Sequence, residues 1–471
     1  MQKKYKVTFD ASFAFTPTAG LSQEARFIVS MFSESSLIQI SCLFMNLHLN
    51  RAARSAEEFI QSYSEHNSYV GWWTRFSIFQ VIARTFFPRL YKLDCHTSFN
   101  PLWRSSFSYS LPSNKMESLS NLDYFFSTYN PAIALEFQDR TIFSPSAKIP
   151  EDTDFFITHA QKHINVKAKN CILITRYVDS LPIRCVDTAD RPLSLLLFRS
   201  YVKHIRSKRI IVCASETEKN MLTHIEPRIH ERNLFTIYPP IQEFKNHRIP
   251  QSGIFRILQN HSRAFDYTTS TETPINKSAL TYLIAISTIE PRKNYLSMIQ
   301  AWSEFREFSQ KDIKLVIVGK YGWGNKKIMR IIKQHVQLGN IFHLTDVPKK
   351  DLEILLSCAE ASIFTSLDEG FGCAPLEAMS CKCPTISSDI PTHREVYGDA
   401  TLYFDPYSIN DIVKKIEIIL DSSKKSKILR ENLIKKGLER VKRYSPETLL
   451  PQWEKLFDEL KKRKEQGKIY Y

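Results

Sequence analysis

Glycine and paired cysteines are scarce in this chain. There are 12 glycines among 471 residues, so each one is expected where the backbone has a special task. The nine cysteines contain no Cys-x-x-Cys pair, and the close pair Cys381 and Cys383 has no matching pair of cysteines or histidines elsewhere. This pattern predicts neither a zinc site nor a disulfide framework. We expect no metal cofactor, and reduced thiols that pack as small apolar side chains.

Long apolar runs are also missing. No stretch approaches the roughly 18 apolar residues that a membrane-spanning helix needs. The amino-terminal stretch MQKKYKVTFDASFAF is basic and lacks the continuous apolar segment of a signal peptide. The sequence therefore predicts a cytoplasmic protein that is soluble or peripheral to the inner face of the membrane.

Negative charge is under-represented, since the chain has 49 acidic residues but 64 lysines and arginines, which gives a formal net charge of +15. Such a surplus attracts nucleic acid, anionic lipid or phosphorylated small molecules without choosing among them. Because no spacing typical of a nucleic-acid-binding module occurs, nucleic acid is not predicted as a partner. A lipid or nucleic-acid surface binder that acts through charge alone stays as an alternative.

The length of the chain suggests two domains. A strand-like KYKVTFDASF leads into a helix-like TAGLSQEARFIVSMF, and further strands follow at 171–179 and near 210, where Ser215 is a candidate helix N-cap. After 281, strands alternate regularly with helices of 10 to 15 residues. This alternation is typical of doubly wound parallel sheets, so the predicted fold class is α/β with two Rossmann-like domains.

The domain boundaries follow from composition. We expect an N-terminal domain over 1–245, a Thr/Ser-rich linker or insertion over 246–280 and a C-terminal domain over 281–445. The last segment, 446–471, places its apolar residues on one helical face. We expect this helix to complete the N-terminal domain.

The stretch DEGFGCAPLEAM, 368–379, follows a predicted strand and contains two glycines. Pro375 marks a helix start, so free N–H groups near Gly372 and Cys373 are expected to face a phosphate-sized anion. Glu377 would lie in the first turn of that helix, where its alternative role is only to complement the helix dipole. Glu369 and Glu377 also suit a paired-carboxylate glycoside hydrolase, but the glycine loop and helix start favour holding a nucleotide sugar.

A second motif, STIEPRKN at 287–294, places Arg292 and Lys293 in a loop that follows another predicted strand. Both loops would lie at the carboxyl edge of the same sheet. A cation pair there can neutralise a diphosphate and stabilise it as a leaving group. The alternative is two solvated surface charges.

Together these stretches resemble the retaining glycosyltransferases of family 4, which have the GT-B fold and an E-x7-E signature. GFGCAPLEAMSCKCPTISSDIPTHREVYGDATLYFDP carries the signature, and STIEPRKN, LVIVGKYGW and DVPKKDLEILLSCAEASIFTSLDEG are similar to neighbouring motifs of that family in the same order. The likeness is strong over 281–408, weaker over 1–25 and 155–240, and nearly absent over 30–150. It implies an acceptor-side N-terminal domain and a C-terminal domain that binds a nucleotide sugar without a divalent metal.

The resemblance also implies site residues. Glu377 would contact the ribose hydroxyls, Glu369 the donor sugar, and Lys293 with Arg292 the diphosphate. The main chain of Gly370, Phe371, Gly372 and Cys373 would contact the sugar and the phosphates. The main chain of Val347 would contact the base. Gly20 would be the pivot of a loop near the phosphates. Catalysis would rest on Glu369, Lys293, Arg292 and Asp179.

The N-terminal half departs from the family pattern. Members often carry a His-Asp pair in a segment like RYHDLIP, whereas this chain has RYVDSLP, with Val178 before Asp179. Valine can neither donate a hydrogen bond nor transfer a proton. His159 is a candidate to serve near the acceptor or donor sugar instead, and its alternative role is structural.

The stretch 71–93 interleaves aromatic and basic side chains, which suits binding to an anionic membrane surface. An ordinary pair of core helices is the alternative. The aromatic and basic residues are Trp72, Trp73, Phe76, Phe79, Phe86 and Phe87 with Arg75, Arg84, Arg89 and Lys92.

The resulting prediction is a retaining hexosyltransferase. It would transfer mannose, our first choice, from a nucleotide sugar such as GDP-mannose to a growing, lipid-linked surface glycan in polysaccharide or lipopolysaccharide biosynthesis. UDP-sugars and dTDP-rhamnose stay open as donors. The alternative, favoured by Val178, is a catalytically impaired nucleotide-sugar-binding or scaffolding protein of a glycan assembly complex.

Overall fold

The computed structural model describes residues 4–12, 20–45, 90–93, 119, 122–127, 146–159, 164, 166, 170–185, 209–241, 244–261 and 280–467. These residues form two compact units. The first contains the described residues up to 178, those of 209–240 and those from 446 onward, and the second contains 179–185 and 241–445. Residues 71–89 of the predicted membrane-binding stretch lie outside the described residues. Residues 262–279 of the predicted linker also lie outside them.

The first unit is built on a sheet whose described strands follow the order β3-β4-β2-β1-β5-β6-β7-β8. Neighbouring strands are parallel, except that β3 runs antiparallel to β4. The strands are β1 (Tyr5–Asp10), β2 (Ile38–Met45), β3 (Leu90–Leu93), β4 (Asp123–Ser127), β5 (Phe155–His159), β6 (Ile172–Tyr177), β7 (Ile210–Cys213) and β8 (Leu234–Thr236). Helices α1 (Gly20–Ser33) and α9 (Glu216–Ile225) and the short helix η3 (Glu231–Asn233) lie between strands. The Ser215 hydroxyl accepts the Glu218 N–H at 3.1 Å, which confirms the predicted N-cap of α9.

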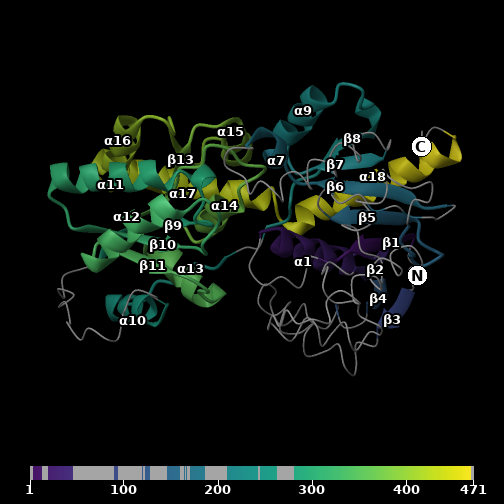
Figure 1. Ribbon diagram of the computed structural model, residues 1–471, viewed down its shortest axis with the longest axis horizontal. Helices are drawn as coiled ribbons and strands as arrows, with labels where there is room; N and C mark the ends of the chain where they lie inside the picture. The colour runs from purple at the N-terminus through teal and green to yellow at the C-terminus, as the bar shows by residue number, and fades with distance from the viewer. Residues whose placement is uncertain are drawn as a thin grey trace, which may run out of the picture. The chain divides into compact units, whose positions relative to one another are not determined.

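The last described helix, α18 (Pro446–Glu465), packs on this first sheet (Figure 1). Its apolar face joins the apolar cluster of β1, β5 and α1, and the Phe457 ring lies 4.5 Å from that of Phe155. The buried residues of this face are Leu449, Trp453, Leu456, Phe457 and Leu460. The core of the first unit therefore contains side chains from both ends of the sequence.

The second unit contains a parallel sheet with the order β11-β10-β9-β12-β13-β14 in the described residues. Its strands are β9 (Thr281–Ile286), β10 (Ile313–Val318), β11 (Ile341–Leu344), β12 (Ala361–Phe364), β13 (Thr385–Ser388) and β14 (Leu402–Phe404). The chain winds outward in one direction from β9 and in the other from β12, so the strand order reverses between these two strands. In sheets of this kind, ligands bind outside the carboxyl ends of the strands at the reversal.

Helices cover both faces of the second sheet (Figure 1). Side chains of β9 alternate between the faces: Leu283 and Ala285 point to one apolar cluster, Tyr282 and Ile284 to the other. The first face carries α11 (Tyr295–Ser309), α12 (Lys326–Gln337) and α16 (Ile409–Leu420), and the second carries α10 (Gln251–His261), α13 (Lys349–Cys358) and α14 (Cys373–Ser380). The unit also contains α7 (Leu181–Arg184), η4 (Pro291–Lys293), α15 (Pro391–Tyr397) and α17 (Lys424–Lys442).

The structure differs from the predicted boundaries in two places. Residues 179–185 and 241–245 belong to the second unit, not to the first. The predicted linker is not structureless where the structure describes it, because 251–261 form helix α10, whose Ile254, Ile257 and Leu258 pack on the second sheet. Within the described part of the chain, no helix is both long and apolar enough to span a bilayer.

Candidate functional site

Two loops meet at the strand reversal of the second sheet. One follows β9 and includes η4, and the other follows β12. The Leu367 N–H donates to the Arg292 carbonyl at 2.9 Å, and the Thr365 hydroxyl donates to the Lys293 carbonyl at 2.8 Å. The two motifs that the sequence suggested separately are therefore neighbours in space.

Glu369 lies at the centre of this meeting point. Arg292 donates from Nη1 to one carboxylate oxygen at 2.7 Å, while Lys293 and Ser366 donate to the other, Ser366 at 2.7 Å. The Thr392 hydroxyl fixes the backbone by donating to the Glu369 carbonyl at 2.7 Å. Burial alone would raise the pKa of Glu369, but the charges of Arg292 and Lys293 outweigh it and hold that pKa well below its usual range. Glu369 is therefore a fully ionised, fully partnered carboxylate.

Arg292 joins the cluster to a second carboxylate. Its Nη2 donates to Glu290 Oε1 at 2.7 Å, and its Nη1 also donates to the Asp368 carbonyl at 2.6 Å. The side chains of Arg292 and Lys293 are only 13% and 16% exposed, so the alternative of two solvated surface charges is wrong. Burial, together with the Arg292 charge, lowers the pKa of Lys293. A buried anion site of this kind can bind a diphosphate if the cations exchange some of their contacts with Glu369.

Gly372 occupies a backbone position that requires a glycine. It caps α14 with a φ of 86° in the left-handed region. A Cβ at this position would lie 2.2 Å from the Tyr397 hydroxyl, which donates to the Gly372 carbonyl at 2.8 Å. Gly370 and Phe371 are buried beside it, and Cys373 is the first residue of α14. The four predicted main-chain contacts thus form one tight turn at the start of a helix.

Glu377 lies differently from our expectation. Because α14 begins at Cys373, Glu377 is its fifth residue and not part of the first turn, so the prediction of a first-turn glutamate that complements the helix dipole is wrong. The residue is 8% exposed, and its carboxylate makes no hydrogen bond within the described part of the chain. Burial raises the pKa of Glu377 to about 7, against an opposing effect of Lys349. The two glutamates of the motif thus differ: Glu369 is a paired anion, whereas Glu377 is about half protonated at neutral pH.

Replacing Glu377 with glutamine is expected to flatten the dependence of stability on pH. Native Glu377 keeps its proton up to about pH 7, whereas the unfolded chain releases it near the ordinary pKa of a glutamate, 4.5. Between these values the native state binds more protons, so the free energy of unfolding falls as pH rises. At about pH 8 the variant should be more stable than the wild type, by on the order of 2–3 kcal/mol, and near pH 4 the two should match.

Urea unfolding of the wild type and Glu377→Gln at both pH values measures this effect. Glu360→Gln, at an exposed position, is the matched control and should shift neither curve. Equal stability differences at pH 4 and pH 8 would contradict the prediction.

Lys349 was missed by sequence reasoning. Val347, which was named, is buried directly after β11, and Lys349 begins α13 two residues later. A cation at the first position of a helix that follows a parallel strand lies at the carboxyl edge of the sheet, which is the signal that could have found it. His393 was also missed. It is buried, and burial lowers its pKa to about 4, so its ring is neutral.

Asp179 lies near the cluster within the second unit. Burial raises its pKa and the Arg292 charge opposes this effect, while its Oδ1 accepts the Leu181 N–H at 3.2 Å. Arg184 of α7 forms an ion pair with Asp368 at 2.9 Å. These contacts explain why 179–185 belong to the second unit. Val178, just before them, is half-buried.

His159 belongs to a buried ionic cluster in the first unit. Its Nε2 lies 3.5 Å from the Glu24 carboxylate, and Arg176 donates to the same carboxylate at 2.7 Å. Burial would raise the pKa of Glu24, but Arg176 and His159 lower it to about 2. Since His159 has no exposed surface, this placement favours its structural alternative. Gly20 is the first residue of α1, after β1.

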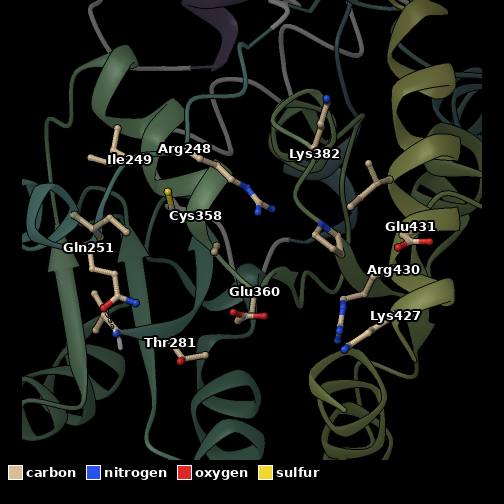
Figure 2. A pocket seen from close by; sticks show the side chains of 15 residues that line it. Arg248, Ile249, Gln251, Thr281, Cys358, Glu360, Lys382, Lys427, Arg430 and Glu431 are labelled. Atoms are coloured by element: carbon tan, nitrogen blue, oxygen red, sulfur yellow. Dashed lines mark hydrogen bonds between the residues drawn. The ribbon is translucent and has the colours of Figure 1, made fainter. Parts of the chain in front are cut away.

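A cavity of about 520 Å³ opens at the opposite, amino edge of the second sheet (Figure 2). It adjoins Thr281 at the start of β9 and Glu360 just before β12. Arg248 points toward its middle from one side, and Lys427 and Arg430 of α17 lie on the other. Cations and carboxylates are mixed in its wall, and it is separate from the Glu369 cluster.

Cys381 and Cys383 are buried in the apolar cluster of α13 and α14. None of the eight cysteines in the described residues forms a disulfide. The described residues also contain no group of three or more His, Cys, Asp or Glu side chains arranged to hold a metal ion.

Residues 271–439 match the model of the family described as glycosyl transferases group 1. The chain also resembles curated proteins over part of its length. O-antigen chain mannosyltransferase B of Escherichia coli is 33% identical over 172 residues, which cover 36% of this chain and 44% of that protein. O-antigen chain mannosyltransferase RfbU of Salmonella typhimurium is 30% identical over 147 residues, which cover 30% of this chain and 40% of that protein. The chain thus matches less than half the length of these relatives.

Solved structures resemble almost the whole chain in fold. Sucrose-phosphate synthase from Thermosynechococcus elongatus has a TM-score of 0.58 at 12% identity and covers 97% of this chain and 99% of its own. TarM has a TM-score of 0.55 at 13% identity, and the match covers 96% of this chain and 98% of TarM. The chain therefore has the predicted α/β architecture of two Rossmann-like domains, as in GT-B glycosyltransferases, and much of its second unit matches the family model of group 1 glycosyl transferases.

Proposed function

We propose that this chain, with its group 1 glycosyl transferase domain, is a retaining glycosyltransferase of family 4 that transfers a hexose from a nucleotide diphosphate sugar to a growing glycan. Mannose is our first choice of sugar and GDP-mannose of donor, because the relatives named above are O-antigen mannosyltransferases. The observation that carries the proposal is the buried Arg292–Lys293–Glu369 cluster at the strand reversal. The proposed acceptor is lipid-linked, on the way to a surface polysaccharide or lipopolysaccharide.

In the proposed donor complex, Arg292 and Lys293 hold the diphosphate. Both cations lie among carboxylates, so a bound diphosphate finds positive charge that is fixed in place and largely dry. The turn from Gly370 to Cys373 offers main-chain N–H groups to the sugar and phosphate at the start of α14. As the bond between sugar and diphosphate breaks, the same cations stabilise the charge that grows on the leaving oxygen.

In this proposal Glu369 contacts the donor sugar, and Glu377 accepts hydrogen bonds from the ribose hydroxyls. Glu377 suits the second role because its buried carboxylate lacks a hydrogen-bond partner in the described residues, and two adjacent ribose hydroxyls can supply donors. The main chain at Val347, three residues after the end of β11, meets the base. The proposal includes no metal, and Arg292 and Lys293 are the cations that face the diphosphate in it.

Asp179 is the remaining proposed catalytic residue. It lies close enough to Arg292 for the two charges to interact, so it can hold that guanidinium in position. Val178 leaves the chain without the usual histidine there. In the proposed course, the acceptor hydroxyl attacks from the face that the diphosphate leaves, and its proton passes to the leaving diphosphate oxygen. This route requires no side-chain base at position 178.

A paired-carboxylate hydrolase is less well supported. Carboxylates of such enzymes lie about 5–9 Å apart, where each ionised group raises the pKa of the other. The one charge in the described residues that acts on Glu377 is Lys349, not Glu369. The distinct surroundings of the two glutamates favour two separate contacts with one donor.

Incubating the protein with GDP-mannose, UDP-glucose and dTDP-rhamnose, with and without lipid-linked acceptor extract, tests the proposal. We expect acceptor-dependent release of nucleoside diphosphate, greatest with GDP-mannose, and a product that retains the anomeric configuration. Tight binding of a nucleotide sugar without any release would instead support the alternative, an impaired binding or scaffolding protein. Release to water alone would indicate a hydrolase.

We also propose that the protein is cytoplasmic and peripheral to the inner face of the membrane, through the aromatic and basic stretch 71–93. Co-sedimentation with vesicles that contain anionic phospholipid, but not with neutral ones, is the expected result. Equal binding to both, or binding that survives neutralisation of Arg75, Arg84 and Arg89, would contradict it.

A further inference from the structure

The cavity at the amino edge of the second sheet has no part in the proposed sugar transfer. All of its lining residues belong to the second unit, so its wall is complete within that unit. Cavities that bind small molecules have volumes of about 300–1,000 Å³, and this one has a volume of about 520 Å³. The space is therefore large enough for a ligand of its own.

Four cations from three separate segments line this cavity. Arg248 precedes α10, Lys382 lies in the turn between α14 and β13, and both Lys427 and Arg430 belong to α17. Arg248 points toward the middle of the space, and the two cations of α17 lie across from it (Figure 2). An anion in the cavity would thus meet positive charge from opposite sides.

These cations are not neutralised by the rest of the wall. The side chains of Arg248, Lys382 and Lys427 form neither an ion pair nor a hydrogen bond with any residue that the structure describes. Two carboxylates, Glu360 and Glu431, also line the cavity, and they too form no ion pair in the described part of the chain. Four cations against two carboxylates leave a surplus of two positive charges around the space.

The backbone that carries Arg248 is held in place by its neighbours. The His247 N–H donates to the Ser357 hydroxyl of α13 at 2.9 Å. The Asn246 amide donates to the Cys381 carbonyl at 2.5 Å, in the turn that also carries Lys382. Two of the three cationic segments are therefore joined directly to each other.

The third cationic segment is also fixed. Arg430 donates from Nη1 to the Ile419 carbonyl at 2.5 Å and to the Asp421 carbonyl at 3.0 Å. Its Nε and Nη2 make no hydrogen bond to the described residues. The guanidinium is thus anchored through one nitrogen, and two further nitrogens are left to donate to a ligand.

Lys382 occupies a backbone position that favours glycine. It follows Cys381, the C-cap of α14, and its φ of 59° lies in the left-handed region. Glycine, and less often asparagine, is usual at this position because a longer side chain destabilises that conformation. A lysine here costs stability, while its side chain lines the cavity.

We propose that this cavity is a second anion site, separate from the Glu369 cluster, and that it binds a phosphorylated small molecule: a sugar phosphate or a nucleoside monophosphate. A phosphate monoester carries a charge of about −1.5 to −2 at neutral pH, which matches the surplus of two. Arg248, Lys427 and Arg430 hold the phosphate by charge-assisted hydrogen bonds. The inference goes beyond the proposed function and does not depend on it.

Calorimetric titration of the full chain with mannose 1-phosphate and with GMP tests the site, with inorganic phosphate and mannose as comparison probes. We expect at least one ester to bind more tightly than inorganic phosphate, because the rest of the molecule fills the cavity, and mannose not to bind. Tighter binding of mannose 1-phosphate identifies a sugar phosphate as the ligand class, and tighter binding of GMP identifies a nucleotide. Either order supports the site.

Variants assign the binding to the cavity. Arg248→Gln and Lys427→Gln should each weaken it roughly tenfold, the size of one lost charge-assisted hydrogen bond. Lys424→Gln, at an exposed position of the same helix outside the cavity wall, is the matched control and should bind like the wild type. Lys382→Gly should bind more weakly yet unfold at a higher urea concentration, so partial unfolding cannot explain its loss of binding.

Arg292→Gln distinguishes this cavity from the proposed donor site and should leave the binding of the ester unchanged. Binding that is lost in Arg292→Gln but kept in Arg248→Gln and Lys427→Gln would overturn the inference. So would an affinity for inorganic phosphate equal to that for both esters, or the absence of binding to either ester at millimolar concentration.

Discussion

Replacing Glu369 with glutamine is expected to reduce turnover by about 10²–10³-fold, the size of effect seen when one preorganised electrostatic contact is lost. Glutamine keeps the shape but removes the charge that fixes Arg292 and Lys293. The two cations then repel one another without a shared counter-ion, and the donor sugar loses its carboxylate partner. Release of nucleoside diphosphate from the preferred donor, measured under saturating acceptor, reports the change in kcat.

Two measurements accompany this variant. Binding of the nucleoside diphosphate should change by less than about tenfold, because positive charge at the diphosphate is kept while the loss falls on the transition state. Glu360→Gln, at the opposite edge of the same sheet, should retain wild-type turnover. A Glu369→Gln protein with normal kcat would rule out a role for this carboxylate in catalysis.

Replacing Arg176 with leucine is expected to lower the free energy of unfolding of the first unit by roughly 3–5 kcal/mol, since it leaves a buried carboxylate without its cation. Arg176 donates to Glu24 at 2.7 Å, to the Cys213 carbonyl at 3.1 Å and to the Ile237 carbonyl at 2.5 Å. It thereby ties α1 to β6, β7 and the segment after β8. Urea unfolding gives the energy, and hydrogen exchange in β6 and β7 assigns the loss to the first unit.

Arg228→Leu is the matched control. Arg228 forms a two-pronged ion pair with Glu226 at 2.6 and 2.8 Å, but its side chain is 74% exposed, so its loss should destabilise the protein far less than the loss of Arg176. The double variant Glu24→Gln with Arg176→Leu should be more stable than Arg176→Leu alone, because the uncompensated charge is gone. Similar losses for Arg176→Leu and Arg228→Leu would show that burial of the ionic cluster does not matter.

The second unit could largely be predicted from sequence, and the reason is visible in its strands. β9 and β10 are central and parallel, so both faces are buried and each contains an unbroken apolar run, Tyr282–Ile286 in β9 and Leu315–Val318 in β10. Arg292 and Glu369 were expected at one edge because each follows such a strand. Their direct ion pair was not predicted, because it depends on how two loops fold toward each other.

Details set by backbone conformation were harder to predict. Pro375 suggested where α14 begins, yet the cap is Gly372, held in place by Tyr397, which is 25 residues further along the chain. That shift moved Glu377 out of the first turn. Lys349 was overlooked for a related reason: the fold brings α13 and α14 to the same face of one sheet, and no spacing within the sequence indicates this.

The placement of α18 has a consequence for synthesis of the chain on the ribosome. The first unit needs Trp453 and Phe457 to cover Phe32 and Phe155, but these residues are made only after the whole second unit has been translated. Until then the apolar surface of the first unit stays open, while the second unit already has all of its own residues. The nascent chain is thus expected to complete its domains in the reverse of their sequence order, contrary to the usual N-terminal-first progression.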